Sequence, residues 1–188
     1  MASPVTGAPG AAILYALLAV LLWPADRTGA PAPFTAARAV GARVARTLWS
    51  ALWAILASVA LWPQNRAPQA MAIQILGTAN GEPGWLAGID KHAAVLVARH
   101  GLAASVVLAA VLALIGAGVW LPAPAVRAVL VLALVLAAAI WVVGEAFGGI
   151  FAGQGTDPNT GPLLALLALA CWPSRIARAW NSSSPCRS

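Results

Sequence analysis

The fold is decided by residues 101–146, which read GLAASVVLAAVLALIGAGVWLPAPAVRAVLVLALVLAAAIWVVGEA. The charged residues of this stretch are Arg127, close to its middle, and Glu145, close to its end. A helix that crosses a bilayer needs about 20 mainly apolar residues. We therefore predict two membrane spans, 101–121 and 126–146, joined by a short proline-containing link as an antiparallel hairpin.

The composition of the whole chain supports a membrane location. Of its 188 residues, 61% are hydrophobic and 9% are charged. Soluble domains carry about 25% charged residues, so an ordinary soluble globule and a disordered chain are both excluded. We expect residues 1–188 to form a single membrane domain.

Three further apolar segments extend the hairpin into a bundle. Residues 47–62 are long enough to span when they include preceding residues, whereas residues 10–23 and 161–172 are shorter. The two short segments lengthen into their flanks as spans, or remain re-entrant or interfacial pieces. The predicted fold class is an all-α polytopic bundle of about five transmembrane helices.

The distribution of charge predicts the orientation of this bundle. Eleven Lys+Arg oppose five Asp+Glu, giving a net charge of +6. Cytoplasmic loops carry the excess of cations, so the cation-rich side is expected to be inside. With the N-terminus outside, eight cations fall on the cytoplasmic side: Arg27, Arg38, Arg43, Arg46, Arg127, Arg175, Arg178 and Arg187. The C-terminus is then cytoplasmic, the expected partner is the lipid bilayer, and nucleic acid is not expected to be a partner.

The basic cytoplasmic segment 24–46 precedes the second span. Arg38, Arg43 and Arg46 recur at spacings of five and three, with Ala and Val between them. We expect a short helix on the cytoplasmic face with these arginines near anionic headgroups. The alternative is a signal that only fixes the orientation.

The outer segment 63–100 ends in an amphipathic stretch. In residues 85–100 apolar side chains recur at helical spacing, which predicts one apolar face. This helix is either a lid on the membrane surface or the first turns of the span that starts at Gly101.

The candidate site is a polar rim at the outer end of the bundle. It comprises Glu145, Gln154, Asp157, Asn159, Arg99 and His100. A carboxylate at the end of a long apolar helix is costly without a partner. We expect Glu145 to pair with Arg99, His100 or Lys91, and Asp157 to cap the last helix. The two interpretations are a structural ion pair with a cap, and a site for a ligand or a quinone headgroup.

The sequence contains no motif that predicts a metal site or a catalytic site. His92 and His100 are eight residues apart, which is about 12 Å along a helix, so they do not share one metal. Cys171 and Cys186 match no metal spacing and are expected to be free thiols. No cofactor, metal ligand or catalytic residue is predicted.

The layout from residue 47 to residue 188 resembles the small DoxX/DoxD-like bacterial membrane proteins. The resemblance rests on a helix that follows Arg43 and Arg46, on the loop residues 83–86, and on a helical hairpin with Gly116 and Gly118 and the short linker 122–127. It implies a small four-helix membrane subunit, linked to a quinone-dependent oxidoreductase in some members. The chain departs from the family by an extra N-terminal span and by lacking the Lys expected after the first family helix.

The sequence thus predicts a small multi-pass protein of the bacterial plasma membrane. The leading expectation is an accessory or structural subunit without its own catalysis, with a membrane protein or a second copy as its partner. The alternatives are a DoxX/DoxD-like subunit of a quinone-linked oxidoreductase and a small transporter.

Overall fold

Helices α3 (Ala42–Ala60) and α6 (Leu102–Gly118) form the most extensive pair of the molecule. The computed structural model of the chain describes residues 8–24, 32–67, 69–78, 83–145, 147 and 159–174. All regular elements within these ranges are helical. The buried positions of α3 recur every three or four residues, which places them on one face of that helix.

Two tryptophans of α3 make the contact with α6. Trp49 and Trp53 are buried with their ring centroids 5.3 Å apart, and the Trp49 Nε1–H donates to the Ile115 carbonyl at 3.0 Å. Gly116 lets the two helices approach closely, since a Cβ there would lie 2.9 Å from the Trp53 Cβ. The Ser50 hydroxyl adds a hydrogen bond of 2.7 Å to the Gly116 carbonyl.

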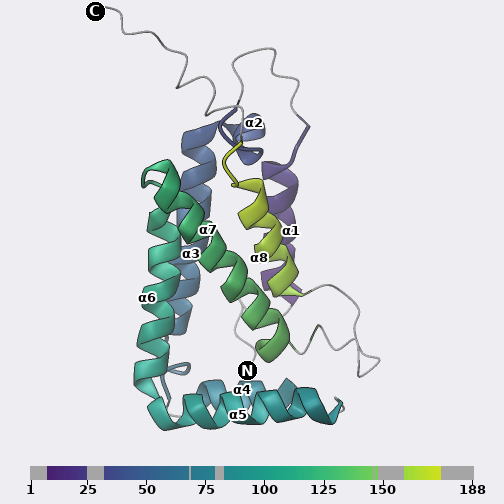
Figure 1. The fold of residues 1–188 in the computed structure, drawn as a ribbon, viewed down its shortest axis with the longest axis vertical. Helices are drawn as coiled ribbons and strands as arrows, with labels where there is room; N and C mark the ends of the chain where they lie inside the picture. Colours follow the sequence, from purple (N-terminus) through teal and green to yellow (C-terminus); the bar gives the residue numbers. More distant parts are fainter. Residues whose placement is uncertain are drawn as a thin grey trace, which may run out of the picture.

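Helix α7 (Ala123–Ala139) follows α6 after a tight turn and continues as one π-helical turn, η1 (Ile140–Gly144). It packs on α8 (Thr160–Ala170), and α8 in turn packs on α1 (Ala8–Leu21). Figure 1 shows α7 crossing the bundle obliquely, with α1 and α8 side by side. The short helix α2 (Ala36–Val40) precedes α3 at one end of the bundle.

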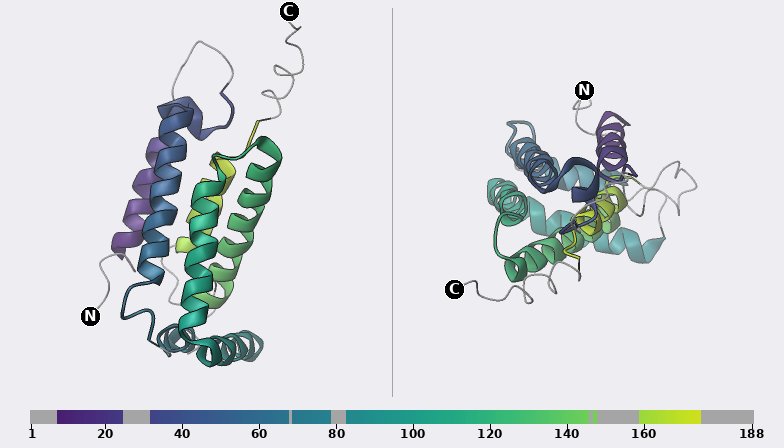
Figure 2. Two further views of the ribbon diagram at one scale, coloured as in Figure 1. Left: turned by 90° about the vertical axis from the view of Figure 1, so that its left-hand side faces the viewer. Right: turned by 90° about the horizontal axis from the view of Figure 1, so that it is seen from above.

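Helices α4 (Ala70–Thr78) and α5 (Gly84–His100) lie across the opposite end (Figures 1 and 2). Helix α5 meets α6 at a bend of 103°, and Gly101 between them has φ 42° and ψ −114°. An L side chain rarely adopts this backbone conformation, so glycine permits the bend. Helix α5 therefore does not continue α6 in a straight line, as it would if residues 85–100 were the first turns of that span. The alternative, a lid on the membrane surface, stays a prediction.

The helices differ in how well they match a bilayer. Within the described residues, α7 with η1 (Ala123–Gly144, 22 residues) is long and apolar enough to cross, and α5 with α6 passes the same test as a bent pair. Residues Gly10–Leu21 and Thr160–Ala170 form shorter apolar helices.

Candidate functional site

Glu145, at the end of η1, caps the N-terminus of α8. Its Oε1 accepts a hydrogen bond of 2.8 Å from the Thr160 N–H, and its Oε2 accepts one of 2.9 Å from the Gly161 N–H. The first N–H groups of a helix have no partner within the helix, and its N-terminus carries partial positive charge. The carboxylate therefore satisfies two donors and complements the helix dipole.

A close helix contact brings this carboxylate to its donors. A Cβ at Gly161 would lie 2.5 Å from the Trp141 Cβ and 2.8 Å from the Ala137 carbonyl oxygen. Only a glycine allows the first turn of α8 to rest directly on α7 and η1. Glu145 follows η1 at once, so its side chain reaches the start of α8.

An aromatic group connects this region to the α4/α5 layer. Phe147 contacts Trp141 at 5.1 Å and Trp85, near the start of α5, at 6.4 Å between ring centroids. The α5 face that includes Leu86 and Asp90 is buried. The end of the bundle that holds Glu145, the acid end, is thus built from η1, α5 and α8 together.

In the part of the chain that the structure describes, Glu145 bonds to these backbone N–H groups and not to Arg99, His100 or Lys91. Arg99 and His100 lie in the last turn of α5, about 20 Å along that helix from Trp85, and both are exposed. The His100 Nδ1–H donates to the Leu96 carbonyl at 2.8 Å. Lys91 instead lines an apolar groove between α4 and α5.

The remaining predicted rim residues are only partly placed. Asn159 occupies the N-cap position of α8 with φ 60°, and its side chain makes no capping hydrogen bond. Gln154 and Asp157 lie outside the described residues. The expected cap by Asp157 stays a prediction, although the first two donors of α8 are already held by Glu145.

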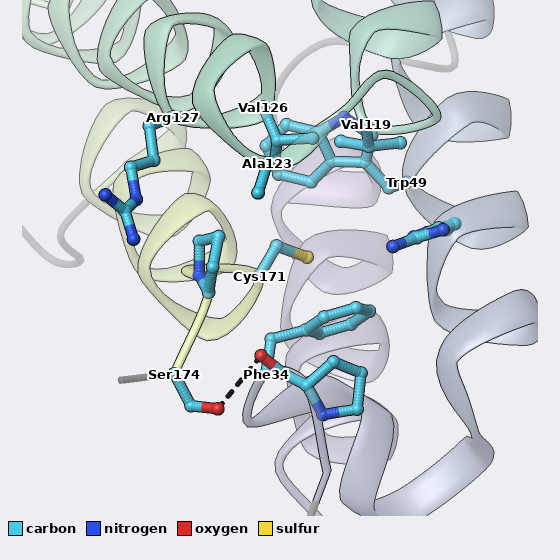
Figure 3. Close-up of a pocket in the computed structure, with 11 residues that line it drawn as sticks. Phe34, Trp49, Val119, Ala123, Val126, Arg127, Cys171 and Ser174 are labelled. Atoms are coloured by element: carbon cyan, nitrogen blue, oxygen red, sulfur yellow. Dashed lines mark hydrogen bonds between the residues drawn. The ribbon is translucent and has the colours of Figure 1, made fainter. Parts of the chain in front are cut away.

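The opposite end of the bundle contains a cavity of about 250 Å³ that is lined by two arginines. Its lining residues are Pro33, Phe34, Arg46, Trp49, Val119, Ala123, Val126, Arg127, Cys171, Pro173 and Ser174. Figure 3 shows Arg127 and Trp49 on opposite sides of the space, with Cys171 between them in this view.

Segments far apart in sequence close this cavity. The Ser174 N–H donates to the Pro33 carbonyl at 2.8 Å, and Phe34 and Pro173 form an isolated antiparallel bridge. The Ser174 hydroxyl lies 3.1 Å from the Ala32 and Pro33 carbonyl oxygens. These bonds hold the chain after α8 against the chain before α2.

The charge of the cavity comes from its two guanidinium groups. Arg46 lies over the Phe34 ring at 5.9 Å and over the Trp120 ring at 5.8 Å, both in the range of cation–π attraction. The Arg127 Nε atom is buried and has no hydrogen-bond partner among the described residues. Both arginines are half-buried, and an unpartnered guanidinium donor such as the Arg127 Nε–H favours an anion as ligand.

This cavity was not predicted from the sequence. The charge distribution predicts Arg46 and Arg127 on the cytoplasmic side, but it contains no signal that they lie close to Phe34, Cys171 or Ser174. The Arg46–Trp49 spacing of three residues, which puts both on one helix face, is the one local signal. In the described part of the chain, no group of three His, Cys, Asp or Glu side chains is placed to hold a metal ion.

Comparison with known proteins gives no family, relative or similar solved structure for this chain. Neither protein-family models, nor curated proteins, nor solved structures contain a match to this chain.

Proposed function

We propose that this chain is a multi-pass protein of the bacterial plasma membrane that acts as an accessory or structural subunit of a membrane assembly. The observation that carries the proposal is the apolar exterior of the helical bundle. Helices α1, α3, α6, α7 and α8 expose large apolar side chains along their length, which a bilayer would cover. These residues are Ile13, Val20, Ile55, Leu102, Val106, Val107, Leu114, Val131, Val135, Leu166 and Leu169.

The placement of charge supports a transmembrane bundle. Arg38, Arg43 and Arg46 lie in α2 and at the start of α3, and Arg127 lies near the start of α7, so all four are at one end. Residues 47–62 and 101–121 between the two ends are uncharged. The arginine end is the cytoplasmic side in this proposal, because cations are retained there.

The α4/α5 layer supports the same placement at the outer surface. Both helices run roughly across the bundle, and exposed apolar side chains such as Ile73, Trp85 and Leu96 alternate with exposed Lys91 and His92. Helices of this composition lie in the headgroup region, where apolar and charged groups are both accommodated.

Helix length explains why Glu145 caps α8. At 1.5 Å per residue, α7 with η1 is about 33 Å long, whereas the 11 residues of α8 cover about 16 Å. In a bilayer the start of α8, which bonds to Glu145, would lie near the end of η1, at the edge of the hydrocarbon core, where its first N–H groups need acceptors from the chain itself. A carboxylate of the same chain meets that need.

The use of the polar groups supports a structural role for this chain. Glu145, Trp49 and Ser50 all bond to backbone groups of neighbouring helices. These contacts hold the bundle together, which is the function expected of a structural component.

Cysteine accessibility tests the membrane placement. In a Cys171→Ala/Cys186→Ala background, Gln64→Cys and Thr35→Cys place single exposed thiols beyond the two ends of α3. We expect an impermeant maleimide to label the Gln64→Cys variant in intact cells, and the Thr35→Cys variant only after permeabilisation. Labelling of both variants from one side, or extraction of the protein from membranes at alkaline pH, would contradict the proposal.

Cross-linking in intact membranes followed by mass measurement in mild detergent tests the role of a subunit. We expect one product of defined stoichiometry, with another membrane protein or with a second copy. A protein that stays uncross-linked and monomeric under all these conditions would argue for a stand-alone protein.

A further inference from the structure

The arginine-lined cavity has a donor set that fits one class of ligand. Among the described residues that line it, the charged side chains are Arg46 and Arg127. The Trp49 Nε1–H bonds to Ile115, and the N–H and hydroxyl of Ser174 bond to carbonyl oxygens of the chain before α2. The Cys171 thiol also lines the cavity but is a weak donor. The guanidinium groups are therefore the donors available to a ligand.

Guanidinium forks match the oxygen geometry of phosphate and carboxylate groups. A volume of about 250 Å³ lies below the usual size of pockets for drug-sized molecules, which start at about 300 Å³. It suits a phosphate with a few attached atoms. Phe34, Val119 and Val126 form an apolar part of the wall, and less polar surroundings strengthen the attraction of the arginines for an anion.

We propose that this cavity binds a phosphate group, with an anionic phospholipid of the cytoplasmic leaflet as its source. The assignment of the source rests on the membrane placement proposed above. Trp120 and Leu121 directly follow the lining residue Val119 and are half exposed, so an acyl chain has an apolar surface beside the site. Tryptophan also prefers the level of the headgroups.

The role of the cavity differs from that of a generally basic surface. Arg38 and Arg43 lie at the same end of the molecule but are exposed and do not line the cavity. A diffuse headgroup interaction would use all the arginines about equally, at about 1 kcal/mol each. A built site depends on Arg46 and Arg127.

The test compares the Arg46→Gln/Arg127→Gln variant with the matched Arg38→Gln/Arg43→Gln variant, which loses the same charge. Full-length protein is purified in mild detergent, and the co-purified phospholipid is quantified by class. The midpoint of thermal unfolding is then measured with short-chain phosphatidylglycerol, short-chain phosphatidylcholine and inorganic phosphate.

We expect phosphatidylglycerol to be retained by, and to stabilise, the unmodified protein and the Arg38/Arg43 variant. Its apparent affinity should fall at least about tenfold in the Arg46/Arg127 variant, since loss of a charge-assisted contact is worth about that factor. Equal stabilisation by inorganic phosphate would identify free phosphate as the source. Equal behaviour of the two double variants, or equal effects of the two lipids, would overturn the proposal.

The Ala123→Leu variant separates a loss of lipid binding from a folding defect. Ala123 lines the cavity but is exposed at the start of α7, so a larger side chain narrows the space while both arginines remain. We expect this variant to keep its thermal stability and to lose phosphatidylglycerol. Cysteine labelling reports membrane placement independently, so a failure of lipid binding is distinguishable from a failure of the proposed function.

Discussion

Charged side chains have different surroundings at the two ends of the bundle. At the α4/α5 end, Glu145 is held by two backbone N–H groups of α8 at 2.8 and 2.9 Å. At the α2 end, Arg46 and Arg127 line a cavity, and the Arg127 Nε has no hydrogen-bond partner among the described residues. A charge satisfied within the chain stabilises the fold, whereas a charge that faces a cavity is suited to bind something else. Changes at the acid end should therefore alter stability more than changes at the arginine end.

The largest effect is expected from Gly161→Ala. The new Cβ would collide with the Trp141 Cβ and the Ala137 carbonyl oxygen at 2.5 and 2.8 Å, so α8 must move away from α7. Overpacking of this kind costs about 1–3 kcal/mol, and we expect the upper value because one of the atoms belongs to the backbone. Unfolding by denaturant in mild detergent measures the loss. Gly144→Ala is the control, since its nearest atom is 3.9 Å away and it should be nearly neutral.

The next effect is expected from Glu145→Ala, which removes both acceptors from the start of α8. Loss of a charged cap should lower the free energy of unfolding by about 2 kcal/mol. Glu145→Gln retains one acceptor oxygen and should lose about half as much. Asp157→Ala should cost less than Glu145→Ala; the reverse order, measured in the same unfolding assay, would show that another group carries the cap.

Gly101→Ala is expected to have an intermediate effect at the bend between α5 and α6. Its φ of 42° is strained for alanine, at a cost of about 1–2 kcal/mol. Gly88→Ala in the middle of α5 meets nothing within 4 Å and should instead stabilise by up to about 1 kcal/mol, since alanine favours helix. Thermal midpoints of the two variants should thus shift in opposite directions. Shifts of the same sign would mean that the bend is not fixed at Gly101.

The smallest effect is expected from Arg46→Ala in lipid-free detergent. It removes two cation–π contacts, with Phe34 and Trp120, that together are worth about 1 kcal/mol. Arg43→Ala on the exposed side of α3 should change the stability by less than about 0.5 kcal/mol. Adding phosphatidylglycerol should widen the difference in stability between these two variants. An unchanged difference would show that Arg46 does not face a ligand site.

Several features were predictable because they depend on local sequence. The helices of the 101–146 hairpin follow from uninterrupted apolar runs, and the helix over residues 85–100 follows from the spacing of its apolar side chains. The need of Glu145 for a partner also follows from its position after a long apolar helix. The sequence did not identify the actual partners of Glu145, because the backbone N–H groups at the start of α8 carry no residue-specific signal.

The sequence by itself determined the all-helical character, the segregation of arginines and the demand that Glu145 be satisfied. These three properties depend on the hydropathy and charge of short stretches of the chain, each a few helical turns long. Only the tertiary structure decided that Glu145 caps α8, that α5 turns by 103° at Gly101, and that Pro33 and Ser174 meet to close an arginine-lined cavity. The physical reason is that a contact between segments some 140 residues apart depends on how all the intervening helices pack, and no local pattern records that packing.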